Sequence, residues 1–468
     1  MGDLRGLTLL SFKEYISNLE GKRIAVIGAG ISNTPLIGAL LDAGIDTTIR
    51  DVQTRKDMGG AAERFEKLGA KLNLGADYLE NLDADVIFRT PGLMPANPSL
   101  TEAVARGAVL TSEMEVFFDV CPCRIIGVTG SDGKTTTTSL IAEMLRREGL
   151  TVHIGGNIGA PLLHKADDMQ YDDIVVLELS SFQLITMNKC PDIAVVTNLS
   201  PNHLDVHGDM AEYIEAKRSI FIRQRKTDRA VFNFDNEYTR EFASAAPGEV
   251  LLFSRNCSVR NGVYCDGETI FDAIDGPGEP IIKAGDVYLP GAHNIENFMA
   301  ACAAVRGLAK HRAMQDTARE FRGVPHRIEL VRELRGVRYY NDSIASSPTR
   351  TIAGLRSFDK KVILIAGGKD KGVAFDGLGA EIVSRVKTLI LTGMTAEMIR
   401  GAVLNSPGYD GTPEILTRGD FTLAVQTAAD IAREGDVVLL SPACTSFDRF
   451  KNFEERGELF REIVKGLI

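Results

Sequence analysis

A strand-like run of β-branched residues that leads into a glycine-containing turn occurs three times along the chain. The first run, residues 23–28, precedes a helix predicted over residues 35–43, and the second, residues 124–129, precedes one predicted over 135–148. Residues 361–367 begin the pattern a third time. Strands that alternate with amphipathic helices are typical of α/β domains with parallel sheets. We therefore predict an α/β fold with several such units.

The length of 468 residues suits about three domains at roughly 150 residues each. We place the boundaries near Pro122 and at Gly323-Val324-Pro325. The prediction is a Rossmann-like domain over 1–120, a central P-loop ATPase-like parallel sheet over 121–322 and a second Rossmann-like domain over 323–468. Residues 250–290 hold short strands and the turn pairs Asn261-Gly262 and Asp266-Gly267, which indicate a small antiparallel insert.

Composition limits the partners. Hydrophobic residues make up 44% and charged residues 25%, as in globular proteins, and the net charge is −10. A nucleic-acid or anionic-membrane binder would normally present a basic face, so we expect neither partner. The chain shows no signal peptide and no apolar run near the ~18 residues that span a bilayer. The seven scattered cysteines fit reduced thiols, so we expect a cytoplasmic protein. We also expect it to be a monomer.

The strongest motif is a glycine-rich loop between a predicted strand and a predicted helix, over residues 127–136. Backbone N–H groups and a helix N-terminus can cradle an anion, a lysine can reach terminal phosphates and a threonine hydroxyl can bind Mg²⁺. Val128 stands where the usual pattern has its first glycine. We interpret the segment as a nucleoside triphosphate site that comprises Gly130, Ser131, Asp132, Gly133, Lys134, Thr135 and Thr136.

A second glycine motif, Gly28-Ala29-Gly30, follows the first strand, and Asp51 ends the next strand. Asn33 replaces the third glycine of the dinucleotide fingerprint. A nicotinamide site, a related nucleotide-diphosphate site and a purely structural turn all remain open for this motif.

Polar residues also follow two probable buried strands, where open α/β sheets bind ligands. Glu178 ends one strand, and Asn198 and His203 follow the other. In the same domain as a phosphate loop, Glu178 and His203 are candidate Mg²⁺ ligands. Lys217 lies in a probable helix, and the residues alone indicate a solvated lysine there.

Taken together, these motifs resemble the Mur ligases, the ATP-dependent amide-forming enzymes of peptidoglycan synthesis. The resemblance covers nearly the whole chain. The segment over 440–457 is similar to the family branch that adds D-glutamate to UDP-N-acetylmuramoyl-L-alanine. The diaminopimelate-adding branch would carry Asp-Asn-Pro-Arg, which is missing from this sequence. The motifs that carry the resemblance are residues 129–135, 156–159, 178–183, 203–205, 291–297, 326–327 and 341–343.

The resemblance implies two Mg²⁺ ions, ATP and an acyl-phosphate intermediate, with a carbamylated Lys217. It implies catalytic roles for Lys134, His203 and Lys217, and metal ligation by Thr135, Glu178, His203 and Lys217. The implied further ATP contacts are Asn294, Asn297, Arg327 and Asp342. The implied contacts of the uridine-nucleotide substrate are Ile31, Ser32, Asp51, Thr90, Gly92 and Asn157. The implied glutamate contacts are Ser346, Lys371, Ser446, Phe447 and Phe453.

Two positions depart from the family pattern. Ile344 stands where many members have lysine, and Lys369 where an acidic or neutral residue is common. Three alternatives remain: ligation of L-glutamate or another Mur or folylpolyglutamate-type reaction, a nicotinamide dehydrogenase, and a non-catalytic nucleotide-gated module. Phosphate release that requires both a UDP-sugar and an amino acid would separate the ligase from the other two classes.

Overall fold

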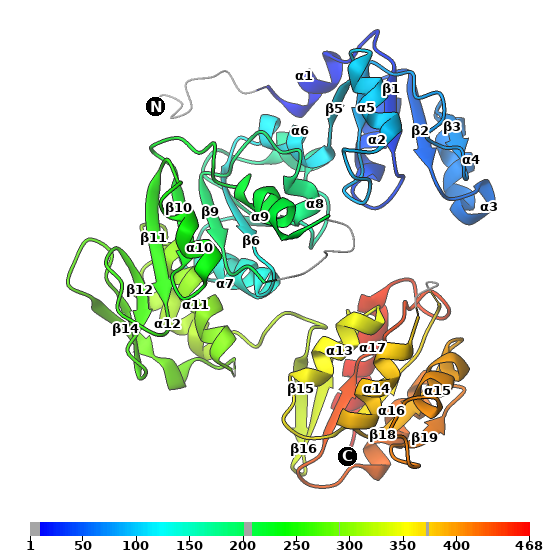
Figure 1. Cartoon of the computed structure of the whole chain (residues 1–468), viewed down its shortest axis with the longest axis vertical. Coiled ribbons are helices and arrows are strands. Elements are labelled where there is room, and N and C mark those ends of the chain that lie inside the picture. The colour runs from blue at the N-terminus through cyan, green and yellow to red at the C-terminus, as the bar shows by residue number, and fades with distance from the viewer. Residues whose placement is uncertain (1–9, 201–207, 290, 371–373) are drawn as a thin grey trace. The chain divides into compact units, whose positions relative to one another are not determined.

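A computed structural model describes residues 10–200, 208–289, 291–370 and 374–468 (Figure 1). The chain divides into two compact units, Met1–Phe321 and Arg322–Ile468. The first unit holds two β-sheets and the second holds one. Among the described residues, no helix is both long enough and apolar enough to cross a membrane.

The first sheet has five parallel strands in the order β3-β2-β1-β4-β5. The strand order reverses direction between β1 and β4, and such a point is where open α/β sheets bind ligands. The strands are β1 (Ile24–Ile27), β2 (Thr47–Asp51), β3 (Lys71–Leu74), β4 (Val86–Phe88) and β5 (Val109–Thr111). The helices are α1 (Phe12–Ser17), α2 (Asn33–Asp42), α3 (Arg55–Met58), α4 (Gly60–Lys67), α5 (Pro98–Ala105) and α6 (Glu113–Val120).

The second sheet has nine strands in the order β14-β13-β12-β11-β10-β9-β6-β8-β7. Pairing is parallel from β7 to β12, and β13 and β14 complete the edge with antiparallel pairs. The strands are β6 (Arg124–Thr129), β7 (Val152–Gly156), β8 (Ile174–Glu178), β9 (Ile193–Val196), β10 (Arg229–Asn233), β11 (Glu249–Ser254), β12 (Gly262–Cys265), β13 (Thr269–Asp272) and β14 (Glu279–Lys283).

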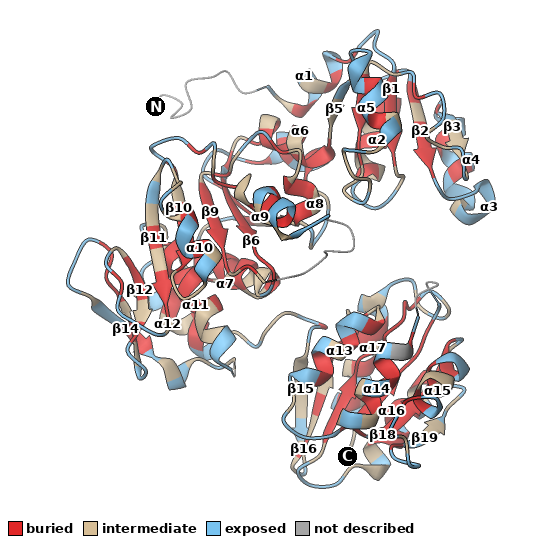
Figure 2. Cartoon of the chain, viewed as in Figure 1, coloured by how far each residue is buried: buried red, intermediate tan, exposed pale blue. Residues whose placement is uncertain are grey.

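Helices and buried cores flank this sheet. The central strands are buried along their length, whereas the helices expose one side (Figure 2). One apolar core includes residues of β6, α7 and α11, and a second joins residues of the first and second sheets. The helices are α7 (Lys134–Arg147), η1 (Leu163–Asp168), α8 (Ser181–Leu184), α9 (Met210–Arg218), α10 (Glu237–Phe242), η2 (Ala284–Asp286), α11 (Ala292–Ala304) and α12 (His311–Glu320).

The second unit is built on six strands in the order β15-β16-β20-β17-β18-β19. Only the β15–β16 pair is antiparallel among its described strands. The strands are β15 (Glu329–Leu334), β16 (Val337–Asn341), β17 (Val362–Ala366), β18 (Val386–Leu391), β19 (Glu414–Thr417) and β20 (Val437–Leu440). The helices are α13 (Pro348–Arg356), α14 (Asp376–Arg385), α15 (Ala396–Leu404), α16 (Phe421–Ile431) and α17 (Phe453–Gly466).

The α/β class with largely parallel sheets is confirmed, and one detail of the predicted insert is wrong. Asp266-Gly267 joins the antiparallel strands β12 and β13 as expected. Asn261-Gly262 closes no hairpin, because β12 begins at Gly262 and pairs in parallel with β11. Gly262 serves close packing instead: a Cβ there would lie 2.0 Å from the Leu252 carbonyl oxygen.

A glycine in α17 makes room for a buried histidine of the second unit. His326 has φ +63° and is buried, and its Nδ1 lies 2.9 Å from Asn341 Nδ2. Asn341 Nδ2 also donates to the Gly457 carbonyl (3.1 Å). A Cβ on Gly457 would lie 2.2 Å from His326 Nδ1, which is closer than real atoms approach. Gly457 therefore permits helix α17 to pack against the turn that carries His326.

We expect Gly457→Ala to lower the free energy of unfolding by about 1–3 kcal/mol, the usual cost of overpacking. Gly466→Ala is the matched control, because it lies in the same helix and a Cβ there meets nothing within 4 Å. Urea unfolding followed by circular dichroism measures both variants. Equal midpoints for Gly457→Ala and Gly466→Ala would contradict this packing account.

Candidate active site

The loop between β6 and α7 is shaped by two glycines that pack against other elements. Gly130 has φ +148°, and a Cβ there would lie 1.9 Å from Thr197 Oγ1. Gly133 has φ +79°, and a Cβ there would lie 2.1 Å from Asn297 Oδ1. Larger residues at either position would push the loop away from the end of β9 and from α11. The predicted phosphate loop thus has the close backbone approach that its glycines allow.

The end of β9 holds the loop in place through hydrogen bonds. The Ser131 N–H donates to the Asn198 carbonyl (2.9 Å), and the Asp132 N–H donates to Asn198 Oδ1 (2.9 Å). The Thr197 hydroxyl donates to the Asp132 carbonyl (2.6 Å). These bonds hold the loop against the end of β9.

Lys134 begins α7 and turns its amine back over the loop. Lys134 Nζ donates to the carbonyls of Gly130 (2.9 Å) and Ser131 (2.7 Å). The N-cap residue of α7 is Gly133, which has no side chain to cap the first N–H groups of the helix. A helix N-terminus with a lysine beside it is a favourable site for phosphate oxygens.

Glu178, at the end of β8, accepts hydrogen bonds from two other residues that the sequence predicted for the site. The Thr135 hydroxyl donates to Glu178 Oε2 (2.6 Å), and Asn157 Nδ2 donates to Glu178 Oε1 (2.9 Å). Carboxylate and hydroxyl oxygens are the hard ligands that Mg²⁺ prefers, so the donor set fits this ion. The described residues contain no group of three or more His, Cys, Asp or Glu side chains placed to hold a metal. His203 lies outside the described residues.

Lys217 is buried, which corrects the solvated position that the residues alone indicated. It is 2% exposed on α9, and its Nζ donates to the Gly130 carbonyl (2.9 Å) and to Thr129 Oγ1 (3.3 Å). The loss of hydration on burial lowers the pKa of Lys217 well below its usual value, and the nearby Lys134 lowers it further. The Glu178 and Asp132 carboxylates act in the opposite direction. Lys217 thus lies against the phosphate loop.

Tyr213 contributes to the site although its sequence context did not single it out. Its hydroxyl lies 3.0 Å from Ser131 Oγ, and Lys217 Nζ lies 4.7 Å from the centre of its ring. Tyr213 and Lys217 are four residues apart on α9, a spacing that places both side chains on one face of a helix. This four-residue spacing from Lys217 is the feature of the sequence that could have identified Tyr213.

Two asparagines from α11 adjoin the same loop. Asn297 Oδ1 accepts a hydrogen bond from Thr137 (3.3 Å), and Asn297 Nδ2 donates to Asn294 Oδ1 (3.3 Å). The structure thereby brings together most of the residues predicted for ATP and metal in the first unit. Arg327 and Asp342 belong to the second unit.

The uridine-nucleotide candidates gather at the carboxyl ends of the first sheet. The N–H groups of Ala29 and Gln53 donate to the Asp51 carboxylate, each at 2.8 Å. Asn33 Nδ2 folds back onto the carbonyls of Ile27 (3.2 Å) and Gly28 (2.9 Å). The Asp51 carboxylate thus holds the glycine turn after β1 against the end of β2.

The other candidates in this sheet border the same turn. A Cβ on Gly28 would lie 3.0 Å from Thr90 Cβ, so the loops after β1 and β4 are neighbours. Ile31 is 81% exposed, and Ser32 and Gly92 are exposed as well. Asn157 is separate from this group, because its side chain contacts Glu178.

Asp342 in the second unit is a buried carboxyl. Ser441 Oγ donates to its Oδ2 (2.7 Å), and the Ile328 N–H donates to its Oδ1 (3.3 Å). Burial raises the pKa of Asp342 to about 7, against the lowering effects of the Ser441 hydrogen bond and the Arg327 charge. Arg327 is exposed.

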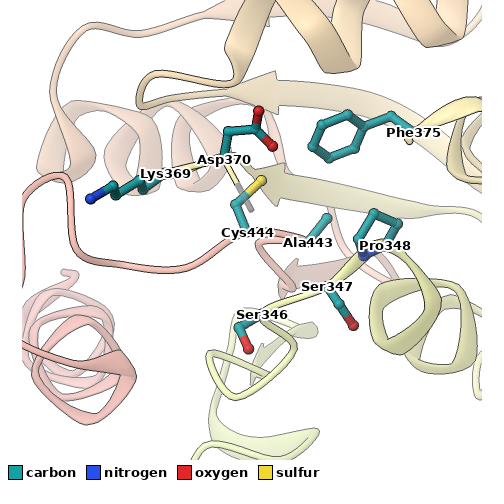
Figure 3. Close-up of a pocket in the computed structure, with 8 residues that line it drawn as sticks. All are labelled: Ser346, Ser347, Pro348, Lys369, Asp370, Phe375, Ala443 and Cys444. Atoms are coloured by element: carbon teal, nitrogen blue, oxygen red, sulfur yellow. The ribbon is translucent and has the colours of Figure 1, made fainter. Parts of the chain in front are cut away.

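A small pocket, with a cavity volume of about 10 Å³, lies in the second unit beside residues predicted to bind glutamate (Figure 3). The Lys369 N–H donates to the Thr445 carbonyl (2.9 Å), and the Thr445 hydroxyl donates to the Lys369 carbonyl (3.0 Å). This exchange joins the loops after β17 and β20. The pocket is lined by Ser346, Ser347, Pro348, Lys369, Asp370, Phe375, Ala443 and Cys444.

The other residues predicted to contact glutamate differ in burial and in their neighbours. Ser446 is buried and Phe447 is 62% exposed. The Phe453 ring packs edge-on against His326, with 6.1 Å between ring centres. Of the five candidates, only Ser346 lines the pocket among the described residues, and Lys371 lies outside them.

Comparisons with known proteins assign the family. The Mur ligase middle domain matches residues 128–305, and the Mur ligase glutamate ligase domain matches residues 326–444. A UDP-N-acetylmuramoylalanine–D-glutamate ligase from Ruminiclostridium cellulolyticum is 49% identical over 97% of this chain and 99% of its own length. The chain belongs to the Mur ligase family. A relative of the same name from Acetivibrio thermocellus is 50% identical over 98% of this chain and 99% of its own.

A solved Mur ligase structure shares the fold at lower identity. UDP-N-acetylmuramate-alanine ligase from Thermotoga maritima aligns over 95% of this chain and 99% of its own, with TM-score 0.55 and 17% identity. The Mur ligase middle domain match spans the phosphate loop, Glu178 and Lys217, and the glutamate ligase domain match spans Asp342 and much of the pocket.

The raised pKa of Asp342 predicts a pH-dependent stability. The folded-state value of about 7 exceeds the usual 3.8, so protonated Asp342 favours the fold below pH 4, and this contribution is lost as the pH rises through 7. Relative to Asp342→Asn, the wild type should lose stability between pH 4 and 7, by at most ~4 kcal/mol. Urea unfolding at several pH values measures the difference.

Other titrating groups are common to the two proteins and cancel in the comparison. Above pH 8 the difference should be constant, and this range is the internal control. Parallel stability curves for wild type and variant across pH 4 to 7 would contradict the burial argument.

Proposed function

We propose that this Mur ligase adds D-glutamate to UDP-N-acetylmuramoyl-L-alanine at the expense of ATP, in cytoplasmic synthesis of peptidoglycan precursors. The observation that carries the proposal is the 49–50% identity, over almost the full length of both chains, to relatives that bear this enzyme name. Two sets of contacts support it: Lys134 and Lys217 both donate to the Gly130 carbonyl of the phosphate loop, and Thr135 donates to Glu178, which brings hard oxygen ligands to the N-terminus of α7.

The three sheets suggest a division of labour, which we propose as part of this function. The Rossmann-like sheet over 1–120 would bind the uridine nucleotide through Ile31, Ser32, Asp51, Thr90 and Gly92. The P-loop sheet over 121–322 would bind ATP and two Mg²⁺ ions. The sheet over 323–468 would bind glutamate.

The chemistry follows from charge. A substrate carboxylate must approach an equally anionic γ-phosphate, and Mg²⁺ bound by Thr135, Glu178, His203 and a Lys217 carbamate would supply charge neutralisation. Lys134 and the N-terminus of α7 hold the phosphate oxygens and stabilise their charge during transfer. The carboxylate oxygen attacks the γ-phosphorus and ADP leaves, which gives an acyl phosphate. The glutamate amine then attacks the acyl carbon, and phosphate leaves as the amide forms.

The pocket in the second unit marks the place where we propose that glutamate binds. Its lining includes the polar residues Ser346, Ser347, Lys369 and Asp370 beside apolar ones. Arg456 is buried and donates to the Ser343 carbonyl (2.8 Å) and to the carbonyl of Cys444, a lining residue of the pocket (3.2 Å). These bonds join the segment that precedes Ser346 to one wall of the pocket. We include Ser346, Lys371, Ser446, Phe447 and Phe453 as glutamate contacts in this proposal.

The proposal predicts phosphate release that requires UDP-N-acetylmuramoyl-L-alanine, D-glutamate, ATP and Mg²⁺ together. Lys134→Ala should lower kcat/KM by at least about 100-fold, because a charged group at the transferring phosphoryl is removed. Lys310→Ala, at an exposed lysine of the same unit, is the control and should be fully active. A coupled phosphate assay measures all three proteins.

The choice of co-substrates separates the alternatives. Equal turnover with L-glutamate would contradict the stereochemical part of the proposal. Reduction or oxidation of a nicotinamide cofactor, or ATP binding without substrate-dependent phosphate release, would contradict the ligase assignment itself.

Lys217 should carry a carbamate when the enzyme is active. A buried neutral amine can react with CO₂, and the product presents two anionic oxygens to a hard cation. Lys217→Ala should therefore lose at least about 100-fold in kcat, and added formate or acetate should restore part of it. Lys134→Ala is the control, because a small carboxylate cannot replace an ammonium. A density map that shows an unmodified amine in active crystals would count against this modification.

A further inference from the structure

Arg89, at the end of β4, is a buried arginine that none of the proposed catalytic steps uses. It is 1% exposed, and burial lowers the pKa of its guanidinium. A buried charge of this kind is costly unless hydrogen bonds compensate it. Its partners therefore show what the residue organises.

One end of the guanidinium holds the loop after β4. Arg89 Nη1 donates to the carbonyls of Leu93 (2.9 Å), Pro91 (3.2 Å) and Thr90 (3.3 Å). This loop contains Thr90 and Gly92, two of the proposed uridine-nucleotide contacts. One end of Arg89 is thus attached to the proposed uridine-binding loop.

The other end of the guanidinium contacts the segment that follows β8 in the second sheet. Arg89 Nη2 donates to the Phe182 carbonyl (2.9 Å) and to Thr186 Oγ1 (3.0 Å). The Thr186 hydroxyl in turn donates to Glu115 Oε2 (3.3 Å), and this nearby carboxylate favours the charged guanidinium.

The segment that Arg89 contacts begins at the proposed metal ligand. Phe182 follows Glu178 by four residues, and between them the Leu179 N–H donates to the Val128 carbonyl (2.8 Å). The Leu179 carbonyl accepts from the Thr129 hydroxyl (2.7 Å) at the start of the phosphate loop. A single side chain therefore links the proposed uridine loop to the proposed phosphoryl-transfer site.

We propose that Arg89 is a positioning residue that sets the distance between the uridine-binding loop and the phosphoryl-transfer site, and so places the substrate carboxylate in line with the γ-phosphate. The inference rests on the proposed function, in which one substrate spans both places. The planar guanidinium has a fixed fork of donors, which a lysine cannot reproduce.

Arg89→Lys should separate binding from turnover. Each end of the site keeps its own residues, so dissociation constants for UDP and for ADP, measured by calorimetry, should stay within about twofold of wild type. A shift of about 1 Å between the two ends should lower kcat by about 10- to 100-fold. Thr186→Val, which removes the hydroxyl that accepts from Arg89 Nη2 with little change of shape, should lower kcat by a smaller factor of about three to ten.

Arg50→Lys is the matched control. Arg50 is also a buried arginine of the first sheet. It donates to the carbonyls of Tyr78, Glu80 and Asn81, which lie between β3 and β4, so these contacts stay within the first sheet. It should share any general cost of replacing a buried arginine but should keep kcat within about twofold.

The outcomes are decisive. An unchanged kcat in Arg89→Lys, an equal kcat loss in Arg50→Lys, or a loss of UDP affinity in parallel with kcat would each overturn the positioning role. If Arg89→Lys does not fold, the kcat of Thr186→Val against wild type decides. Failure of the proposed function is distinct, because wild type itself would then release no phosphate with D-glutamate.

Discussion

The close packing of two loop glycines against neighbouring elements is the constraint on which the site depends. Gly130 lies on Thr197 and Gly133 lies on Asn297, at distances that leave no room for a side chain. This packing places the end of β9 and helix α11 against one loop. The anion cradle is therefore made by tertiary contact as much as by its own sequence, and Lys217 contacts it at the Gly130 carbonyl.

Buried lysine and arginine side chains recur among the described residues, and backbone carbonyls accept their hydrogen bonds. Lys217 donates to a loop carbonyl, Arg89 to the loop after β4 and to α8, and Arg456 to two segments beside the pocket. A charged donor that bridges separate segments fixes their spacing, because leaving any partner unsatisfied in a buried place is costly. The hydrogen bonds of these buried side chains therefore fix the spacing of the segments that lie near the proposed ligand sites.

Much of the local structure could be predicted from the sequence. The strands that became β6, β9 and β17 are continuous apolar runs, and buried parallel strands require such runs. The loop at Gly130–Lys134 was identified because glycine, lysine and threonine have distinct roles there. Asn261-Gly262 was misjudged, because a turn-like pair can equally serve close strand packing.

The sequence by itself determined the α/β class, the phosphate loop and, by resemblance, the family. Only the tertiary structure decided that Lys217 is buried, that Asn157 contacts Glu178 and that Arg89 spans two sheets. The reason is physical. Propensity and glycine spacing act over a few residues, whereas burial, pKa and hydrogen-bond partners depend on segments far apart in the chain.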